Sequence, residues 1–85
     1  MKFAIYTKPN CKFCEQAKAL LIQKGFTYTE HVLGEDFTRS WIVQAFPLMK
    51  TYPIILMNGK LIGGFTELQE AFDADPNFGL TLLLE

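Results

Sequence analysis

The sequence predicts a single α/β domain over residues 1–85, with a four-stranded mixed sheet flanked by three to four helices in the order β-α-β-α-β-β-α. Three observations predict this class. Residues 2–32 hold an apolar run, a helical pattern and a β-rich run, which favours two parallel strands joined by a helix. Asn58-Gly59 lies between two apolar runs and is typical of a hairpin. A chain of 85 residues that is 49% hydrophobic has room for one core.

The first half of the chain predicts a strand, a helix and a second strand. Residues 2–7 form an apolar run that ends at Lys8-Pro9. A helix is expected over residues 11–24, followed by Gly25, the residue type that most often ends a helix. Its apolar stripe, spaced at i, i+4, i+7 and i+8, consists of Phe13, Ala17, Leu20 and Leu21. Residues 26–32 alternate and are rich in β-formers, so a strand follows, with His31 expected exposed near its end.

The second half predicts a helix, a hairpin and one or two further helices. The acidic residues after Gly34 are typical of a first helical turn, and Pro47 ends the pattern. The apolar face of this helix, in which Trp41 is expected to pack, consists of Phe37, Trp41, Ile42, Ala45 and Phe46. Residues 53–57 and 60–62 are the hairpin strands. Thr66 is expected to cap a third helix, with Gln69 completing a capping box. Asp75-Pro76 favours a last short helix over residues 76–84.

The only two cysteines, Cys11 and Cys14, lie where the first strand pattern stops and the helix pattern begins. Free N–H groups at a helix N-terminus favour an anion. Together with the nearby Lys8 and Lys12, they are expected to lower the pKa of Cys11 from about 8.5 into the range of roughly 3.5–7.5. Cys14, one turn further along, should be more shielded. Cys11 is therefore predicted to be the attacking sulfur and Cys14 the resolving one.

Three other roles for the cysteine pair compete with this one. A zinc site needs about four ligands, and this chain offers one Cys pair and a single distant His31, so no metal site is expected. A bridge across four residues closes almost no loop, so a purely structural disulfide has little to stabilise. Two buried, inert cysteines remain an alternative. A C-x-x-C beside a strand–helix–strand pattern nevertheless favours a redox role.

Charge and hydropathy exclude several classes of partner. The net charge of -1 gives no global attraction to nucleic acid or to an anionic membrane. No run approaches the roughly 20 apolar residues of a membrane helix, and the N-terminal apolar run is too short for a secretion signal. We therefore expect a cytoplasmic protein, since a lone C-x-x-C in a reducing compartment usually forms a transient, catalytic disulfide.

These pieces together resemble the glutaredoxin family of the thioredoxin-like fold, and its short bacterial and phage members most. Four segments carry the resemblance over nearly the whole chain. They are Lys8-Pro9-Asn10-Cys11-Lys12-Phe13-Cys14, Lys50-Thr51-Tyr52-Pro53, the hairpin, and Gly63-Gly64-Phe65-Thr66. The resemblance implies a dithiol, monomeric enzyme with no permanently bound cofactor. It implies glutathione as reductant and disulfide-containing or glutathionylated proteins as substrates, with ribonucleotide reductase as a family-level example.

The resemblance also implies a glutathione site. Pro53 would be a cis-proline facing the cysteines, and the backbone of Tyr52 would pair with glutathione as an added strand does. Lys8 and Lys50 would meet its carboxylates, Phe13 would lie beside it, and the γ-glutamyl end would be received by Gly64, Phe65 and Thr66.

The chain departs from the family pattern between the cysteines, where many relatives have Pro and Tyr and this chain has Lys12 and Phe13. Tyr52 is also bulkier than the usual residue before the cis-proline. Two alternatives of function stay open. One is a redoxin reduced by thioredoxin reductase, and the other is a carrier in which two chains bridge an iron–sulfur cluster through Cys11 and two glutathiones.

Overall fold

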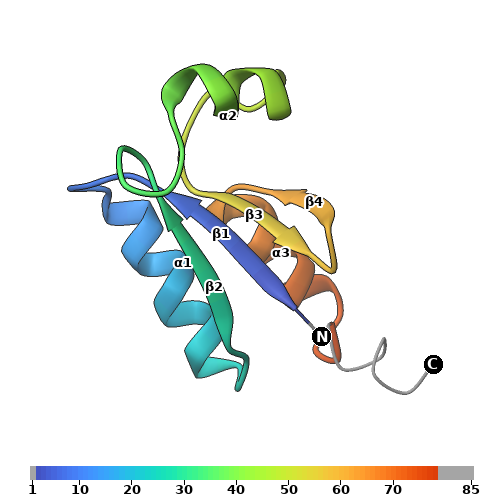
Figure 1. The fold of residues 1–85 in the computed structure, drawn as a ribbon. Coiled ribbons are helices and arrows are strands. Elements are labelled where there is room, and N and C mark those ends of the chain that lie inside the picture. The colour runs from blue at the N-terminus through green and yellow to red at the C-terminus, as the bar shows by residue number, and fades with distance from the viewer. Residues whose placement is uncertain (1, 79–85) are drawn as a thin grey trace.

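The computed structural model describes residues 2–78, which form a four-stranded sheet and three helices (Figure 1). The strands are β1 (Phe3–Thr7), β2 (Tyr28–Val32), β3 (Ile54–Met57) and β4 (Lys60–Gly63). The helices are α1 (Lys12–Gln23), α2 (Arg39–Ala45) and α3 (Phe65–Ala74). The strand order is β2-β1-β3-β4, in which β1 pairs parallel with β2 and antiparallel with β3, and β3 pairs antiparallel with β4. The predicted mixed sheet is confirmed.

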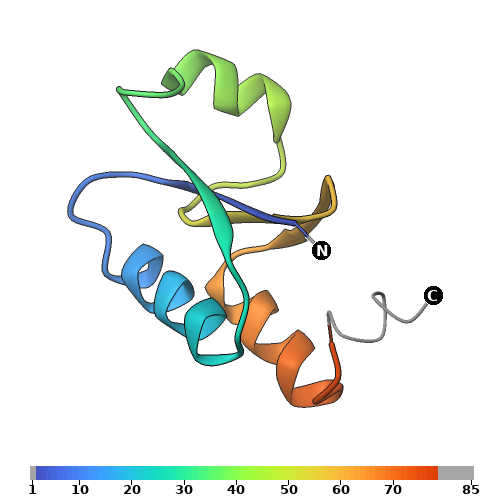
Figure 2. The ribbon, with the colours of Figure 1, turned by 60° about the horizontal axis from the view of Figure 1, so that its bottom comes forward.

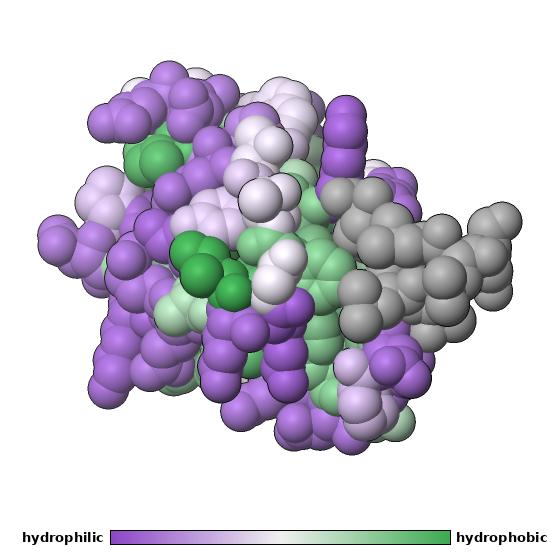
Figure 3. All heavy atoms as spheres, turned by 90° about the horizontal axis from the view of Figure 1, so that it is seen from below, coloured by the Kyte–Doolittle hydropathy of each residue, from purple (hydrophilic) through white to green (hydrophobic). Residues whose placement is uncertain are grey.

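The helices lie on both faces of the sheet, with α1 and α3 together on one face and α2 on the other (Figure 2). Burial alternates along β1, so Phe3 and Ile5 point into one layer and Tyr6 toward the other. The core under α1 and α3 consists of Phe3, Ile5, Ala17, Leu21, Ile55, Leu68 and Phe72. Seen from below, the outer surface is largely hydrophilic, with hydrophobic side chains in a narrower area (Figure 3). Over residues 2–78, no helix has the length and apolar character needed to cross a membrane.

Local sequence fixes the ends of α1 and the hairpin turn as predicted. Helix α1 starts after Cys11, whose sulfur accepts a hydrogen bond from the helix, and Gly25 follows its end with a φ of 87°. At the hairpin, Asn58 and Gly59 have φ values of 51° and 80°. Both values are positive, as the favoured two-residue hairpin turn requires.

Helix α2 begins later than predicted, at Arg39 and not near Gly34. The carboxylate of Asp36 accepts a hydrogen bond from the N–H of Val32 at 2.8 Å and so closes a turn. Short acidic side chains that bond to nearby backbone in this way compete with helix formation. Thr38 is the N-cap instead, and its hydroxyl accepts from the N–H of Trp41 at 3.1 Å.

The environments predicted for Trp41 and His31 were partly wrong. Trp41 contacts the ring of Tyr6 at 5.7 Å between centroids but remains 47% exposed, because α2 covers the sheet incompletely. His31 was expected exposed and is half-buried, since its ring stacks on Tyr6 with centroids 4.7 Å apart.

The predicted cap of α3 was also wrong. The N-cap is Gly64, and Thr66 lies exposed inside the first turn. The N–H of Gly64 donates to Oε1 of Glu67 at 2.7 Å. The helix is therefore capped by a carboxylate three residues later in the sequence. Residues 76–78, predicted to open a last helix, form a turn in which the N–H of Phe78 donates to the carbonyl of Asp75. The rest of that predicted helix lies outside the described residues.

Candidate active site

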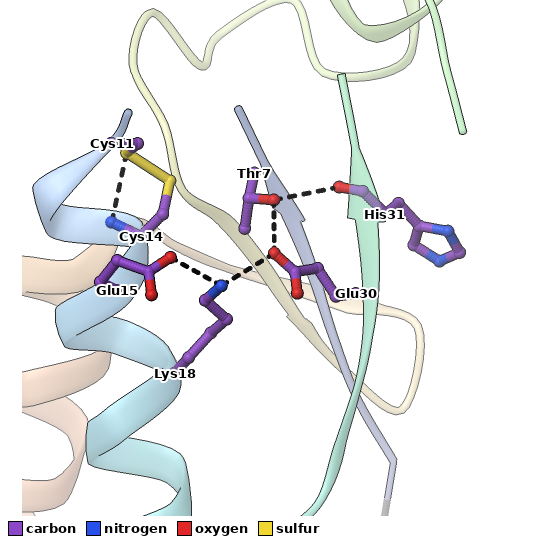
Figure 4. The surroundings of a disulfide bond; sticks show 7 residues. All are labelled: Thr7, Cys11, Cys14, Glu15, Lys18, Glu30 and His31. Carbon is purple, nitrogen blue, oxygen red and sulfur yellow. Dashed lines mark hydrogen bonds and ion pairs between the residues drawn. A yellow bond between two sulfur atoms is a disulfide. The ribbon is translucent and has the colours of Figure 1, made fainter. Parts of the chain in front are cut away.

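The two cysteines lie at the first turn of α1, where the sequence predicted them, and are joined by a disulfide bond (Figure 4). Their Cα atoms are 5.2 Å apart. Cys14 is fully buried, with 0% exposure, whereas Cys11 is half-buried at the helix tip. Cys11 is therefore the more accessible of the two sulfurs, and the roles of attacking and resolving sulfur stay a prediction.

The helix tip presents a hydrogen-bond donor to the outer sulfur. The N–H of Cys14 donates to Sγ of Cys11 at 3.2 Å, and the N–H of Glu15 donates to the carbonyl of Cys11. Backbone N–H groups at this position have no partner within the helix and favour negative charge nearby. In the reduced protein, the same donor would stabilise a thiolate on Cys11.

A polar clamp lies one helical turn beyond Cys14 (Figure 4) and consists of Thr7, Lys18 and Glu30. The hydroxyl of Thr7 donates to Oε2 of Glu30 at 2.7 Å, and Nζ of Lys18 donates to the same oxygen at 3.0 Å. Lys18 also pairs with Glu15 at 2.7 Å. The clamp therefore joins the strand end before the cysteine loop to the helix after it. No sequence pattern predicts the clamp, because its members lie far apart along the chain.

The charges of the clamp are held in their ionised forms. Burial raises the pKa of Glu30, but the hydrogen bonds from Thr7 and Lys18 outweigh burial and leave that pKa below its usual value. The hydrogen bond to Glu15 raises the pKa of Lys18; burial opposes this, and Glu30 adds to it. The clamp is thus a fixed ion pair, poorly suited to accepting or releasing protons near neutral pH.

A cavity of about 490 Å³ opens beside Cys11. Its walls come from the cysteine loop, the start of α2 and the segment before β3. Of the residues expected to bind glutathione, it brings together Lys8, Phe13, Lys50 and Tyr52. Nζ of Lys8 lies 5.8 Å from the centre of the Tyr52 ring.

The remaining residues of the expected glutathione site lie next to this cavity without lining it. The Tyr52–Pro53 peptide bond is cis, as the resemblance implied, and Pro53 is buried. Gly64 is buried close to the carbonyl of Pro53, where a Cβ would meet the oxygen at 3.4 Å. The ring of Phe65 stacks on Phe13 at 6.1 Å between centroids, while Thr66 is exposed. The N-terminus of α3 therefore also lies beside the first turn of α1, which carries the cysteines.

Arg39, the first residue of α2, also lines the cavity and was not predicted as a site residue. It lies 28 positions from Cys11 in the sequence, and the helix was predicted to start earlier, so no spacing pointed to it. Within residues 2–78, no group of three or more His, Cys, Asp and Glu side chains is placed to hold a metal ion.

Comparisons with known proteins agree with this geometry. The family model for glutaredoxin matches residues 3–62. Glutaredoxin 3 of Escherichia coli K12 is 32% identical over 81 residues, covering 95% of this chain and 94% of that protein. The hybrid peroxiredoxin hyPrx5 of Haemophilus influenzae is 42% identical over 69 residues, which are 81% of this chain but only 28% of that protein.

A solved structure places the fold in the same group. The crystal structure of glutaredoxin 1 from Francisella tularensis, complexed with cacodylate, superposes with a TM-score of 0.77 at 28% identity, covering 89% of this chain and 96% of that chain. With the Cys11–Cys14 pair at the helix tip, these matches suggest thiol–disulfide oxidoreductase chemistry. The chain belongs to the glutaredoxin family, with the thioredoxin-like fold.

Proposed function

We propose that the protein is a glutathione-dependent thiol–disulfide oxidoreductase that reduces glutathione mixed disulfides and protein disulfides. The observation that carries the proposal is the half-buried sulfur of Cys11, which sits on a helix tip at the mouth of a cavity. A thiolate there can attack a disulfide that enters from the cavity. A reducing cytoplasm, in which glutathione is abundant, is the compartment that suits this chemistry.

With a glutathionylated substrate, one cysteine is sufficient. The Cys11 thiolate attacks the glutathione sulfur, a new S–S bond forms to Cys11, and the substrate leaves as a thiolate that takes a proton from water. A second glutathione, as its thiolate, attacks the glutathionyl sulfur. Glutathione disulfide leaves, and the Cys11 thiolate is restored.

With a protein disulfide, both cysteines are needed. Cys11 forms a mixed disulfide with one substrate sulfur and releases the other. Cys14, which lies one turn away, then attacks Sγ of Cys11 and displaces the reduced substrate. The Cys11–Cys14 disulfide that forms is the bond present in this structure. Two glutathiones reduce it and leave as glutathione disulfide.

The glutathione contacts are proposed residue by residue. Lys8 and Lys50 pair with carboxylates of glutathione, and the backbone of Tyr52 hydrogen-bonds to its peptide. Phe13 packs beside it, and Pro53 shapes the loop. The N-terminus of α3, at Gly64, Phe65 and Thr66, receives the γ-glutamyl carboxylate. The Gly64 N–H is already bonded to Glu67, so the free N–H groups of Phe65 and Thr66 are the donors for that carboxylate.

Two variants test the assignment of the sulfurs. Cys11→Ser should abolish turnover of every disulfide substrate, because no attacking thiolate remains. Cys14→Ser should keep turnover of a small glutathione mixed disulfide while losing reduction of a protein disulfide. The measurement is a coupled assay with glutathione, glutathione reductase and NADPH.

The same assay separates the alternatives. Reduction that proceeds with thioredoxin reductase and not with glutathione would contradict glutathione dependence. Activity retained by Cys11→Ser would show that the role of the two sulfurs is assigned wrongly. If the protein purified anaerobically is coloured, absorbs visible light and does not turn over disulfide substrates, the result would point to the iron–sulfur carrier.

A further inference from the structure

All the charged side chains that line the cavity beside Cys11 are positive. They are Lys8, Lys12, Arg39 and Lys50, and no Asp or Glu of the described residues joins them in the cavity wall. The whole chain has a net charge of -1, so this concentration is local and is not a consequence of composition. The four cations come from two loops and two helix starts, which only the tertiary structure brings together.

Among the described residues, these four cations have no carboxylate partners. Within residues 2–78 the ion pairs are those of Lys18 with Glu15 and Glu30, on the far side of the cysteine pair. The side chains of all four cavity cations are exposed. One of them, Lys8, contacts the ring of Tyr52. Their field is therefore directed into the cavity and the solvent in front of Cys11.

Glutathione alone does not neutralise this charge. It has two carboxylates and one ammonium group, so it offsets at most two of the four positive charges. Two positive charges remain beside the sulfur when glutathione is bound. A substrate that brings its own carboxylates would be favoured there, whereas one that brings Lys or Arg would be opposed.

We propose that the protein substrates present their disulfide in an acidic segment, with two or more Asp or Glu residues flanking the reactive cysteine. This inference rests on the proposed function and adds the chemistry of the partner. The cations line the same cavity as Cys11, so a partner that reacts there must hold a disulfide. That requirement favours a protein over a nucleic acid.

The test uses three glutathionylated peptides of equal length with Glu, Gln or Lys on both sides of the cysteine. Their kcat/KM is measured with glutathione in excess at low and high salt. At about 20 mM salt, we expect the acidic peptide to exceed the basic one by roughly tenfold. At about 1 M salt, where charges are screened within about 3 Å, the ratio should fall to about twofold or less.

A pair of matched variants locates the effect. Lys12→Gln should lower the ratio of the acidic to the neutral Gln peptide by about threefold, the effect of one charge pair some 6 Å apart in water. Changes in the reactivity of Cys11 cancel in this ratio, because the same thiolate attacks each peptide. Lys60→Gln is the control and should leave the ratio unchanged. Lys60 is also exposed, but it lies at the other end of the sheet from the cysteine loop. It pairs with Met57, which pairs with Phe3 at the start of β1, whereas Thr7 at the end of β1 precedes the cysteine loop.

Each outcome decides between the two proposals. Equal rates for the three peptides at low salt would overturn the inference while leaving glutathione-dependent turnover in place. An equal effect of Lys60→Gln and Lys12→Gln would also overturn it, since net charge and not the cavity would then select the substrate. If no peptide is reduced, the proposed function fails and the inference fails with it. Stronger inhibition of neutral-peptide turnover by an oligonucleotide than by an unmodified acidic peptide would assign the cations to nucleic acid instead.

Discussion

Replacing Glu30 by Gln tests whether the clamp beside the cysteine loop stabilises the fold. Oε2 of Glu30 accepts from the Thr7 hydroxyl at 2.7 Å and from Nζ of Lys18 at 3.0 Å. A hydrogen bond to a charged group contributes about 1.5–3 kcal/mol, and a neutral one about 1 kcal/mol. Gln keeps the shape and loses the charge, so each bond weakens by about 0.5–2 kcal/mol. Because the Glu30 side chain is 29% exposed, solvent reduces the total to about 1–2 kcal/mol.

The expected result is a lower melting temperature for Glu30→Gln at pH 7. For a domain of this size, 1 kcal/mol corresponds to about 4–8 °C, so Tm should fall by roughly 5–15 °C. Thermal unfolding followed by circular dichroism, with the cysteine pair kept oxidised, measures it. The matched control is Glu70→Gln on α3, an exposed carboxylate for which the described residues show no ion pair. That control should stay within about 0.5 kcal/mol of the wild type.

The difference should also depend on pH with a definite sign. The pKa of Glu30 is lower in the folded protein than in the unfolded chain, where it is about 4.3. Its stabilisation is therefore complete above the unfolded value and is lost as the pH falls through the folded value. The difference in Tm between wild type and Glu30→Gln should disappear below about pH 4. A gap of zero at pH 7, or one that widens in acid, would refute the argument.

Three further changes test the start of α3. Glu67→Gln should destabilise the fold by about 1 kcal/mol in chemical unfolding, because its carboxylate caps the N–H of Gly64 at 2.7 Å. Thr66→Ala should change stability by less than about 0.5 kcal/mol, and a larger loss would restore Thr66 as the cap. Gly63→Ala should destabilise by more than about 1 kcal/mol, since its φ is 131° and a Cβ would lie 2.8 Å from Cγ of Glu67. An unchanged unfolding midpoint for Gly63→Ala would contradict that strain.

The features that could be predicted from the sequence are those set by residues within about four positions of one another. The Asn58-Gly59 turn follows from the positive φ values that these two residue types tolerate. The place of Cys11 at the start of α1 follows from the strand pattern before it and the apolar stripe after it. With these local features in order, the cysteine pair and the mixed sheet could be predicted.

Where two local preferences competed, neighbouring groups in the fold decided. Asp36 could have begun a helix, but its carboxylate bonds to Val32 and delays α2 to Arg39. Thr66 could have capped α3, but the N–H that needs a partner belongs to the buried Gly64, and Glu67 reaches it. Asp, Thr and Gly are all common at the start of a helix, so residue type by itself does not fix the first residue of either helix.

The tertiary structure alone decided which distant charges meet. Glu30 joins Thr7 and Lys18 because the parallel pairing of β1 and β2 brings its strand beside the end of β1. Arg39 joins Lys8, Lys12 and Lys50 because α2 crosses above the segment that precedes β3. Such contacts depend on how whole elements pack to bury the core. Exposed charged side chains carry no periodic pattern of their own, so no spacing in the sequence reveals where they gather.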